Sequence, residues 1–415
     1  MMNIWYFCLD PNISIHTHHR APTIHIQETI SSLQALGHEV GHFLYGDQLR
    51  PWEQRLRRPA QTQTQPEAKQ PSAQARRPKE VQGSPNSWLG HLKPLLRDAY
   101  QLYQNALLDR SLIEPVFAQN RIDLVYERLS HSKSSVSACA QKRDIPFIVE
   151  SNSTVVELRE FWGSPLWPLV GRVEIETVRR ADAVIVVSTP LKRYYEGQGI
   201  PSDKIAVMPN GVNESCFTPD RVSRNLRAEL GLEDKTVVGF VGNVRAYHGV
   251  ELLVSLARML DLARHNIQFL VVGDGMGMED LLKTLNQDDL AGYFTFTGTV
   301  PHDEVPEYIA AMDICLMPRS NRQGSPMKLL EYGAMGKAMV APNLGPIQDI
   351  FCHGDTAYLF EPENVPEMAA AVSALADDVH LRTSMGAAAR RHILAHHTWR
   401  KNAERITEIY HQITL

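Results

Sequence analysis

The chain of 415 residues lacks the features that define several classes of protein. No apolar run approaches the roughly 18 residues that a membrane-spanning helix needs, so we expect none. No basic segment precedes the first apolar stretch, and we expect no signal peptide. The five cysteines (Cys8, Cys139, Cys216, Cys315 and Cys352) are far apart and form no Cys-x-x-Cys pair. This spacing predicts reduced thiols in a cytoplasmic protein and argues against a disulfide framework or a zinc site.

Charge is present but unevenly spread. The net charge is −5, yet residues 50–80 hold eight Lys/Arg and three Asp/Glu, a local charge of +5 that leaves −10 for the rest. A nucleic-acid-binding face spreads basic residues over folded structure and interleaves aromatic side chains among them. Neither pattern is present, so we expect no nucleic-acid partner.

Residues 50–90 do not fit the interior of a domain. They contain Gln-Thr-Gln-Thr-Gln-Pro, five more prolines and scattered arginines, with low hydrophobicity and no period. This composition predicts a disordered insertion. Two interpretations stay open: a tolerated surface loop, which we favour, and a basic arm that contacts the acidic inner face of a membrane.

Elsewhere, short apolar strands alternate with helical patterns, which is typical of parallel α/β units. The strands that we predict are 3–9, 39–44, 122–127, 147–150, 183–187 and 205–208, then 236–241, 268–272, 294–296, 314–317 and 338–341. The helices that we predict lie near 23–36, 250–262, 277–286, 303–311, 326–335, 346–351, 365–376, 379–395 and 398–413. The length suits two domains with a hinge near 210–220. The last helix has an apolar face that needs a docking partner, and the first domain is a candidate.

The most informative segment is Gly324–Lys337. Ser325 is a suitable N-cap and Pro326 suits the first turn, so a helix is expected to start here. The free N–H groups of a first helical turn bind anions, and Lys328 adds a positive charge. Glu331 falls one turn further, where its carboxylate could accept hydrogen bonds from a diol. A phosphate at the helix start and a diol one turn along describe a nucleoside diphosphate.

Three further loops follow predicted strands in the second half. They are Gly239–Arg245 with His248, Val271–Gly275, and Thr297–Pro301, whose exposed backbone could hydrogen-bond a base edge. Glycines at strand ends allow a ligand to approach closely, and parallel sheets bind ligands at this edge. Four such loops in order therefore predict a nucleotide-binding site.

In this order, the segments resemble the C-terminal domain of GT-B glycosyltransferases of the large retaining family GT4. The first half is similar to that family too, through Leu36–Val40, Ala181–Ser188 and the passage Lys204–Val212. The resemblance implies an α/β fold of GT-B type, with two Rossmann-like domains facing across a cleft. It places an acceptor-binding domain at 1–212, a nucleotide-sugar-binding domain at 213–396, and a C-terminal helix at 397–415 that packs back on the first domain.

The resemblance also implies a nucleotide-diphosphate sugar donor, UDP- or GDP-linked, with no metal or other cofactor, because protein cations and helix N-termini hold the diphosphate. The catalytic residues that we expect are Arg245, His248, Lys328 and Glu331. The donor-binding residues that we expect are Gly242, Asn243, Gly273, Asp274, Thr299, Val300, Gln323, Gly324, Ser325, Pro326, Met327 and Leu329.

Three positions depart from the usual pattern of the family. Asn243 stands where an Arg is common, His248 where a Lys is common, and Gln323 where the first Glu of a Glu-x7-Glu pair is common; Glu331, the second Glu, is intact. A subgroup with His-Gly and Ser-Pro-x-Lys-x-x-Glu-Tyr motifs resembles this chain. These departures leave open how the leaving diphosphate is neutralised.

The first domain is harder to interpret. We expect His18, His19, Arg20, Arg128, Glu150 and Asn152 to bind the acceptor. A structural Arg128–Glu150 pair is an equal alternative. The histidine cluster lacks a neighbouring carboxylate, which favours polar lining over a metal site. We interpret His131 as solvated.

The function we predict is retaining sugar transfer to a hydroxyl acceptor, in cell-surface polysaccharide or glycolipid synthesis, with peripheral contact to the inner membrane face. No carboxylate pair of the kind that retaining glycosidases use is evident. The resemblance implies front-face transfer, in which the leaving phosphate takes the acceptor proton. Three alternatives stay open: a small-molecule glycosyltransferase, a nucleotide-sugar epimerase of GT-B shape, and a non-catalytic relative.

Overall fold

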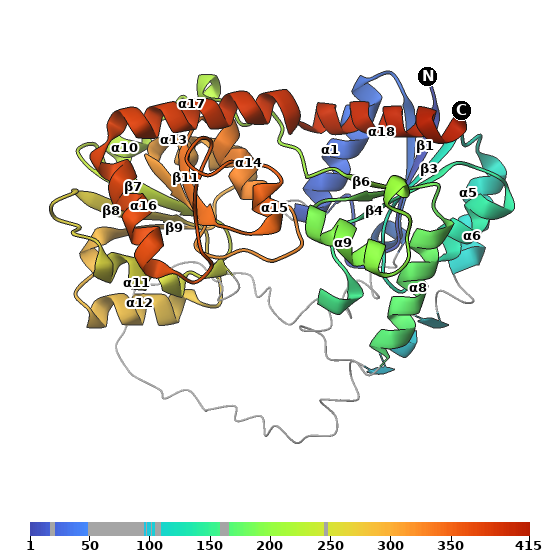
Figure 1. Ribbon diagram of the computed structural model, residues 1–415, viewed down its shortest axis with the longest axis horizontal. Coiled ribbons are helices and arrows are strands. Elements are labelled where there is room, and N and C mark those ends of the chain that lie inside the picture. The colour runs from blue at the N-terminus through green and yellow to red at the C-terminus, as the bar shows by residue number, and fades with distance from the viewer. Residues whose placement is uncertain are drawn as a thin grey trace, which may run out of the picture.

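The computed structural model describes residues 1–16, 21–48, 95–96, 98–100, 102–103, 109–157, 166–244 and 248–415. These residues form two lobes that lie side by side, each built around a six-stranded sheet (Figure 1). The predicted insertion at 50–90 lies outside the described residues.

The first lobe holds a parallel sheet with strand order β2-β1-β3-β4-β5-β6. Its strands are β1 (Asn3–Cys8), β2 (Glu39–Leu44), β3 (Leu124–Arg128), β4 (Phe147–Ser151), β5 (Ala183–Val186) and β6 (Ile205–Val207). Its helices are α1 (Ala21–Ala35), α2 (Tyr45–Gln48), α5 (Asp109–Gln119), α6 (Ser135–Lys142), α8 (Trp167–Arg180), α9 (Thr189–Gly197) and the short η1 (Ser202–Lys204).

The second lobe repeats this architecture with the order β12-β11-β10-β7-β8-β9, again parallel. Its strands are β7 (Thr236–Val241), β8 (Ile267–Val272), β9 (Phe294–Gly298), β10 (Ile314–Leu316), β11 (Ala338–Pro342) and β12 (Tyr358–Phe360). Its helices are α10 (Leu226–Glu229), α11 (Glu251–Met259), α12 (Met278–Gln287), α13 (Val305–Ala311), α14 (Met327–Ala334), α15 (Gly345–Gln348), α16 (Val365–Asp377) and α17 (Val379–His396), with short η2 (Pro219–Arg221), η4 (Ala291–Tyr293) and η5 (His302–Glu304).

Both sheets are buried on both faces, which explains the continuous apolar runs of their strands. Successive side chains of a strand point to opposite faces, so Phe7 joins one apolar cluster of the first lobe while Tyr6 joins the other. In the second lobe Phe240 and Val241 divide in the same way. The predicted α/β architecture, with two Rossmann-like units, is confirmed.

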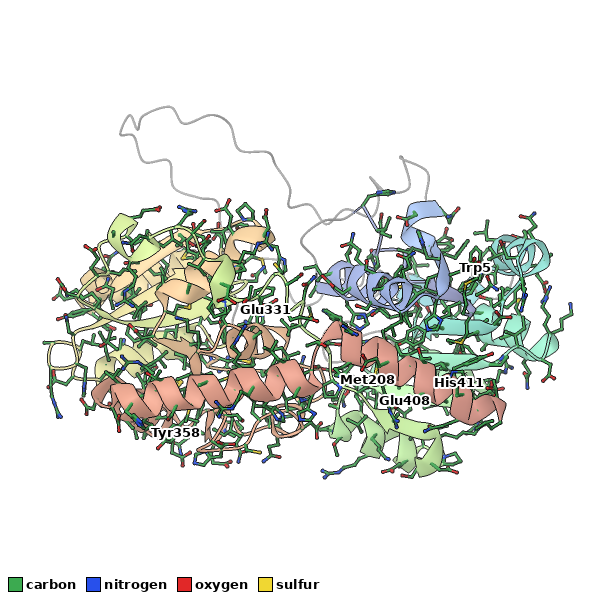
Figure 2. All side chains as sticks on the ribbon, turned by 90° about the horizontal axis from the view of Figure 1, so that it is seen from above. Trp5, Met208, Glu331, Tyr358, Glu408 and His411 are labelled. Atoms are coloured by element: carbon green, nitrogen blue, oxygen red, sulfur yellow. The ribbon has the colours of Figure 1, made fainter. Side chains whose placement is uncertain are left out.

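The last two helices connect the lobes. Figure 1 shows α17 along the second lobe and α18 (Trp399–Thr414) along the first, beside α1. Ile406 and Ile409 of α18 are buried in the same cluster as Ile26 and Ile30 of α1. Figure 2 shows the same crossing from above, with Met208 beside α18.

The crossing between α17 and α18 is held against the linker that leaves the first sheet. The N–H of Val212 donates to the carbonyl of His397 (2.9 Å), and the N–H of Trp399 donates to the carbonyl of Val212 (3.3 Å). A Cβ at Gly211 would lie 2.4 Å from the nitrogen of Trp399, so only glycine lets the two segments approach this closely.

Candidate active site

Glycines bring three strand ends of the second sheet into one row. The N–H of Gly242 donates to the carbonyl of Val272, and the N–H of Gly273 donates to that of Gly298, both at 2.9 Å. Gly242 and Gly273 have φ values of 140° and 130°, and a Cβ on Gly273 would lie 2.1 Å from the Gly242 oxygen. The loops after β7, β8 and β9 therefore meet only because these positions lack a side chain.

Polar side chains stand at the rim of this row. Asn243, Asp274 and Thr299 are exposed, while Val300 is partly buried against the core. The N–H of Val244 donates to the carbonyl of Asp274 (3.0 Å), which ties the first loop to the second. The predicted donor-binding positions of these loops thus lie along one edge of the sheet.

Lys328 supplies a buried positive charge next to the same row. Among the described residues its Nζ has no hydrogen-bond partner, and it lies 4.4 Å from the centroid of the Phe240 ring. A Cβ on Gly242 would approach this Nζ to 2.8 Å, so the lysine reaches the glycine loop itself. Burial lowers the pKa of Lys328 to about 8, although the charge of Glu331 acts in the opposite direction.

His248 contacts the same aromatic ring, with centroids 6.2 Å apart at an angle of 61°. Phe240 therefore has both His248 and the Lys328 ammonium as neighbours, although β7 and α14 are far apart in the sequence. Arg245, the remaining predicted cation, lies outside the described residues.

The start of α14 differs in detail from the prediction. The helix begins at Met327 with Pro326 at the N-cap and no side-chain cap, so the predicted capping role of Ser325 is wrong. The Ser325 hydroxyl instead accepts from the N–H of Asn210 (3.1 Å). The side chain of Leu329 is buried in the core, and its N–H donates to the Pro326 carbonyl (3.0 Å). In this turn the N–H groups of Met327 and Lys328 are the ones without an intrahelical acceptor.

Glu331 is paired with a histidine that the sequence analysis missed. The Nε2 of His302, in η5, lies 3.5 Å from Oε1 of Glu331. The hydrogen bond to Glu331 raises the pKa of His302, and the charges of Glu331, Glu28 and Asp303 act in the same direction. Figure 2 labels Glu331 in the second lobe, toward the first. His302 directly follows Thr299-Val300-Pro301, a loop that the sequence analysis already assigned to the donor site. That position was the available signal for His302.

The loop before α14 is hydrogen-bonded to the first lobe. The Thr154 hydroxyl donates to Oε1 of Gln323 (3.0 Å), and the Ser188 hydroxyl donates to the Gln323 carbonyl (2.5 Å). The N–H of Gly324 donates to Asn321 within the loop (2.6 Å). Gln323 therefore belongs to a contact between the lobes as well as to the predicted donor site.

The predicted acceptor residues Arg128, Glu150 and Asn152 come together at the ends of β3 and β4. Glu150 is buried and receives hydrogen bonds from Tyr126 and Asn152, the latter at 2.6 Å. His25 of α1 lies 2.9 Å from its Oε1 and Arg128 lies 3.5 Å from the same atom. Burial raises the pKa of Glu150, but His25, Arg128 and Tyr126 outweigh it and lower the value to about 2. The other predicted acceptor residues, His18, His19 and Arg20, lie outside the described residues.

The interpretation of His131 as solvated is wrong. Its Nδ1 lies 2.7 Å from the buried carboxylate of Glu174, and its Nε2 lies 3.2 Å from the hydroxyl of Ser153. The side chain retains 16% exposure. Glu174 comes from α8, which the sequence analysis did not predict, so this pair was out of reach.

Searches of the described residues for two other features were negative. They contain no group of three or more His, Cys, Asp or Glu side chains arranged to hold a metal ion. They also contain no helix that is long and apolar enough to cross a membrane.

Two models of known protein families match this chain. The profile of "Glycosyltransferase Family 4" matches residues 23–215, and that of "Glycosyl transferases group 1" matches residues 235–378. The chain belongs to glycosyltransferase family 4. The two matches fall on the first and the second lobe, respectively.

Curated relatives carry related names. The alpha-D-kanosaminyltransferase of Streptomyces kanamyceticus is 27% identical over 60% of this chain and 65% of its own length. A GDP-mannose-dependent alpha-(1-6)-phosphatidylinositol monomannoside mannosyltransferase of Mycobacterium tuberculosis is 27% identical over 55% of this chain and 61% of its own length. The chain thus spans less than two thirds of either relative.

Solved structures share the fold over nearly the whole chain. Anabaena HepE in complex with UDP is 16% identical, with a TM-score of 0.66 over 98% of this chain and 99% of its own. Sucrose-phosphate synthase from Thermosynechococcus elongatus is 19% identical, with a TM-score of 0.69 over 100% and 99%.

Proposed function

We propose that this family 4 protein transfers a sugar from a nucleotide-diphosphate sugar to a hydroxyl acceptor, with retention at the anomeric carbon and without a metal ion. One observation carries the proposal. A buried ammonium, that of Lys328, lies without a hydrogen-bond partner among the described residues, next to a glycine-lined row of strand ends and the start of α14.

A diphosphate would complete this arrangement. A buried charge is costly unless it is paired, and a phosphate oxygen at Nζ would supply the missing partner. The free N–H groups of Met327 and Lys328 and the helix dipole would add to this attraction. The second lobe, residues 213–396, would therefore hold the donor, which is UDP- or GDP-linked.

Glu331 and the strand ends would fix the rest of the nucleotide. Glu331 lies one helical turn from Lys328, so its carboxylate would accept hydrogen bonds from the ribose diol. The exposed backbone at Thr299 and Val300 would meet the base edge. The part of the site between the ribose and the base would be lined by Gly242, Asn243, Gly273 and Asp274.

Catalysis would rest on stabilising the leaving diphosphate as negative charge develops on it. Lys328 and His248 are the described side chains placed for this, and Arg245 is a further candidate. In front-face transfer the acceptor oxygen bonds to the anomeric carbon, the bond from that carbon to the phosphate oxygen breaks, and the acceptor proton passes to that phosphate oxygen. No protein carboxylate takes part in this scheme.

The acceptor would bind to the first lobe, residues 1–212, with α18 (within 397–415) holding that lobe in place. A lipid-linked acceptor in cell-surface polysaccharide or glycolipid synthesis is the leading candidate, which would put the protein in peripheral contact with the inner membrane face. The name of the M. tuberculosis relative includes a phosphatidylinositol mannoside. The name of the 2-deoxystreptamine glucosyltransferase of Streptomyces kanamyceticus includes a small-molecule acceptor, which makes such an acceptor the second candidate.

Product release tests the proposal. Free nucleoside diphosphate would be measured with a panel of UDP- and GDP-sugars, with and without a lipid extract or a small polyol. The proposal expects one donor whose breakdown is stimulated by an acceptor. Isomerised donor without transfer would indicate an epimerase, and no turnover with any donor would favour the non-catalytic relative.

A further inference from the structure

Three polar side chains from separate segments meet at the edge of the first sheet, outside the site described for the donor. His131 follows β3, Ser153 follows β4, and Glu174 lies on α8. The Nδ1 of His131 lies 2.7 Å from Oε2 of Glu174, and its Nε2 lies 3.2 Å from Oγ of Ser153. The imidazole thus has a different partner on each ring nitrogen.

The other contacts of Glu174 determine which ring nitrogen carries the proton. Glu174 is fully buried, and it accepts from the N–H of Val155 (2.7 Å) and the hydroxyl of Tyr195 (3.2 Å). A carboxylate with donors on both oxygens acts as an acceptor only, so Nδ1 of His131 carries a hydrogen. In its neutral form the imidazole therefore presents the lone pair of Nε2 toward the Ser153 hydroxyl.

The cluster lies beside the contact between the two lobes. Thr154, the residue after Ser153, donates its hydroxyl hydrogen to Gln323 across that contact. Gln323 leads directly through Gly324 and Ser325 to the start of α14 and Lys328. His131 keeps 16% exposure while Glu174 has none, so the imidazole edge is accessible from outside and the carboxylate is behind it.

We infer that His131 and Ser153 form a binding site for a hydroxyl group of the acceptor. The hydroxyl of a sugar, cyclitol or other polyol would replace the direct hydrogen bond between these two side chains. It would donate to Nε2 of His131, and its oxygen would accept from the Ser153 hydroxyl. Glu174 is a positioning residue, because it holds the imidazole in the tautomer and orientation that leave Nε2 as an acceptor. This inference rests on the proposed transferase function and assigns the cluster to its acceptor side.

Two substitutions of His131 separate binding from structural support. In His131→Asn the amide can replace Nδ1 and keep the contact with Glu174, but nothing replaces Nε2. In His131→Gln the longer side chain can reach the position of Nε2. Both would be compared with wild type for acceptor-independent donor hydrolysis and for acceptor-stimulated release of nucleoside diphosphate. The acceptor probes are myo-inositol, 2-deoxystreptamine and vesicles that contain phosphatidylinositol.

For His131→Asn we expect an acceptor KM raised by about 10-fold, the effect of one lost hydrogen bond to a polar group. Donor hydrolysis and the donor KM should stay within about 2-fold of wild type, because the donor-side groups are unchanged. His131→Gln should recover part of the acceptor KM. Ser153→Ala leaves the contact between His131 and Glu174 intact and should also raise the acceptor KM. This variant tests the inference if the His131 variants fold poorly.

Asp182→Asn is a matched control, because the Asp182 carboxylate accepts from the N–H of Phe147 at the opposite end of β4. It should leave the ratio of transfer to hydrolysis unchanged. An acceptor KM equal to that of wild type in both His131→Asn and Ser153→Ala would overturn the inference. Equal loss of transfer and hydrolysis in these variants would also overturn it, as the mark of a structural role. If wild type itself shows no release that an acceptor stimulates, the proposed function fails, and this inference fails with it.

Discussion

Nζ of Lys328 lies 4.4 Å from the centroid of the Phe240 ring and has no hydrogen-bond partner among the described residues. A cation over an aromatic face gains about 0.5–2 kcal/mol, which is less than the cost of removing an ammonium from water. The contact with Phe240 therefore does not offset the burial of this charge, in agreement with the proposed role of Lys328 in holding the diphosphate.

Replacing the charge should not destabilise the empty protein. Lys328→Met keeps the length and apolar stem of the side chain and removes the unpaired charge, so its melting temperature should equal or exceed that of wild type. Lys337→Met is the matched control. Lys337 lies just after the other end of α14 and donates to the carbonyls of Ala310 (2.7 Å) and Met312 (2.8 Å), so its loss should lower the melting temperature.

The pH dependence of stability should differ between wild type and Lys328→Met. Because the pKa of Lys328 is lowered to about 8 in the folded state, the unfolded chain binds more protons between about pH 8 and 10.5. The free energy of unfolding of wild type should therefore rise relative to the variant over that window. Parallel curves, measured by denaturant titration, would contradict the burial of this charge.

Glu331→Gln should weaken donor binding more than turnover. A neutral amide is a poorer acceptor for two ribose hydroxyls than a carboxylate, so we expect the donor KM to rise by about 10-fold. His302→Gln is the control, because it removes the partner of Glu331 but leaves the carboxylate in place. Steady-state kinetics with the preferred donor measure both. An unchanged KM in Glu331→Gln would exclude the ribose role.

Gln323→Ala and Thr154→Val remove the same hydrogen bond between the lobes. If Gln323 also contacts the donor, its removal should raise the donor KM by about 10-fold, whereas Thr154→Val should change it by less than about 3-fold. Equal effects of the two substitutions would mean that Gln323 serves only to join the lobes.

Glu150→Gln should destabilise the first lobe, by about 3 kcal/mol at pH 7, because it leaves the largely buried Arg128 without a counter-charge. The pKa of Glu150 is lowered to about 2, so its contribution to stability is present above about pH 4.5 and is lost as the pH falls toward 2. Thermal denaturation should be followed from pH 7 to pH 3. The melting temperatures of Glu150→Gln and wild type should become similar only in the acid range. A gap independent of pH would contradict this assignment.

Sequence patterns were sufficient for the fold because parallel strands and their glycines leave strong local signals. The strand ends at Gly242, Gly273 and Gly298, and a helix near 326–335, were predicted from local patterns and lie together in the structure, where that helix is Met327–Ala334. The sequence does not predict β12 or the helices α5, α6, α8 and α9. α5 contains Pro115 within the helix, and α8 buries Glu174 and Thr177, so tertiary packing and not the local sequence decides these conformations.

The sequence patterns do not predict contacts between segments that are far apart in the chain. Nothing local pairs His302 with Glu331, His131 with Glu174, or Thr154 with Gln323, because each pair joins elements that the fold alone brings together. Ser325 is a further example. Its local sequence predicts an N-cap, but its hydroxyl accepts a hydrogen bond from the N–H of Asn210 in the linker instead.

Binding of nucleotides to wild type and to Lys328→Met tests the central claim most directly. Isothermal titration at pH 7 would compare UDP with UMP and GDP with GMP. For one base we expect wild type to bind the diphosphate at least about 10-fold more tightly than the monophosphate, and the variant to lose this difference. Diphosphate binding that is no tighter than monophosphate binding in wild type, or a preference that survives in Lys328→Met, would contradict the account.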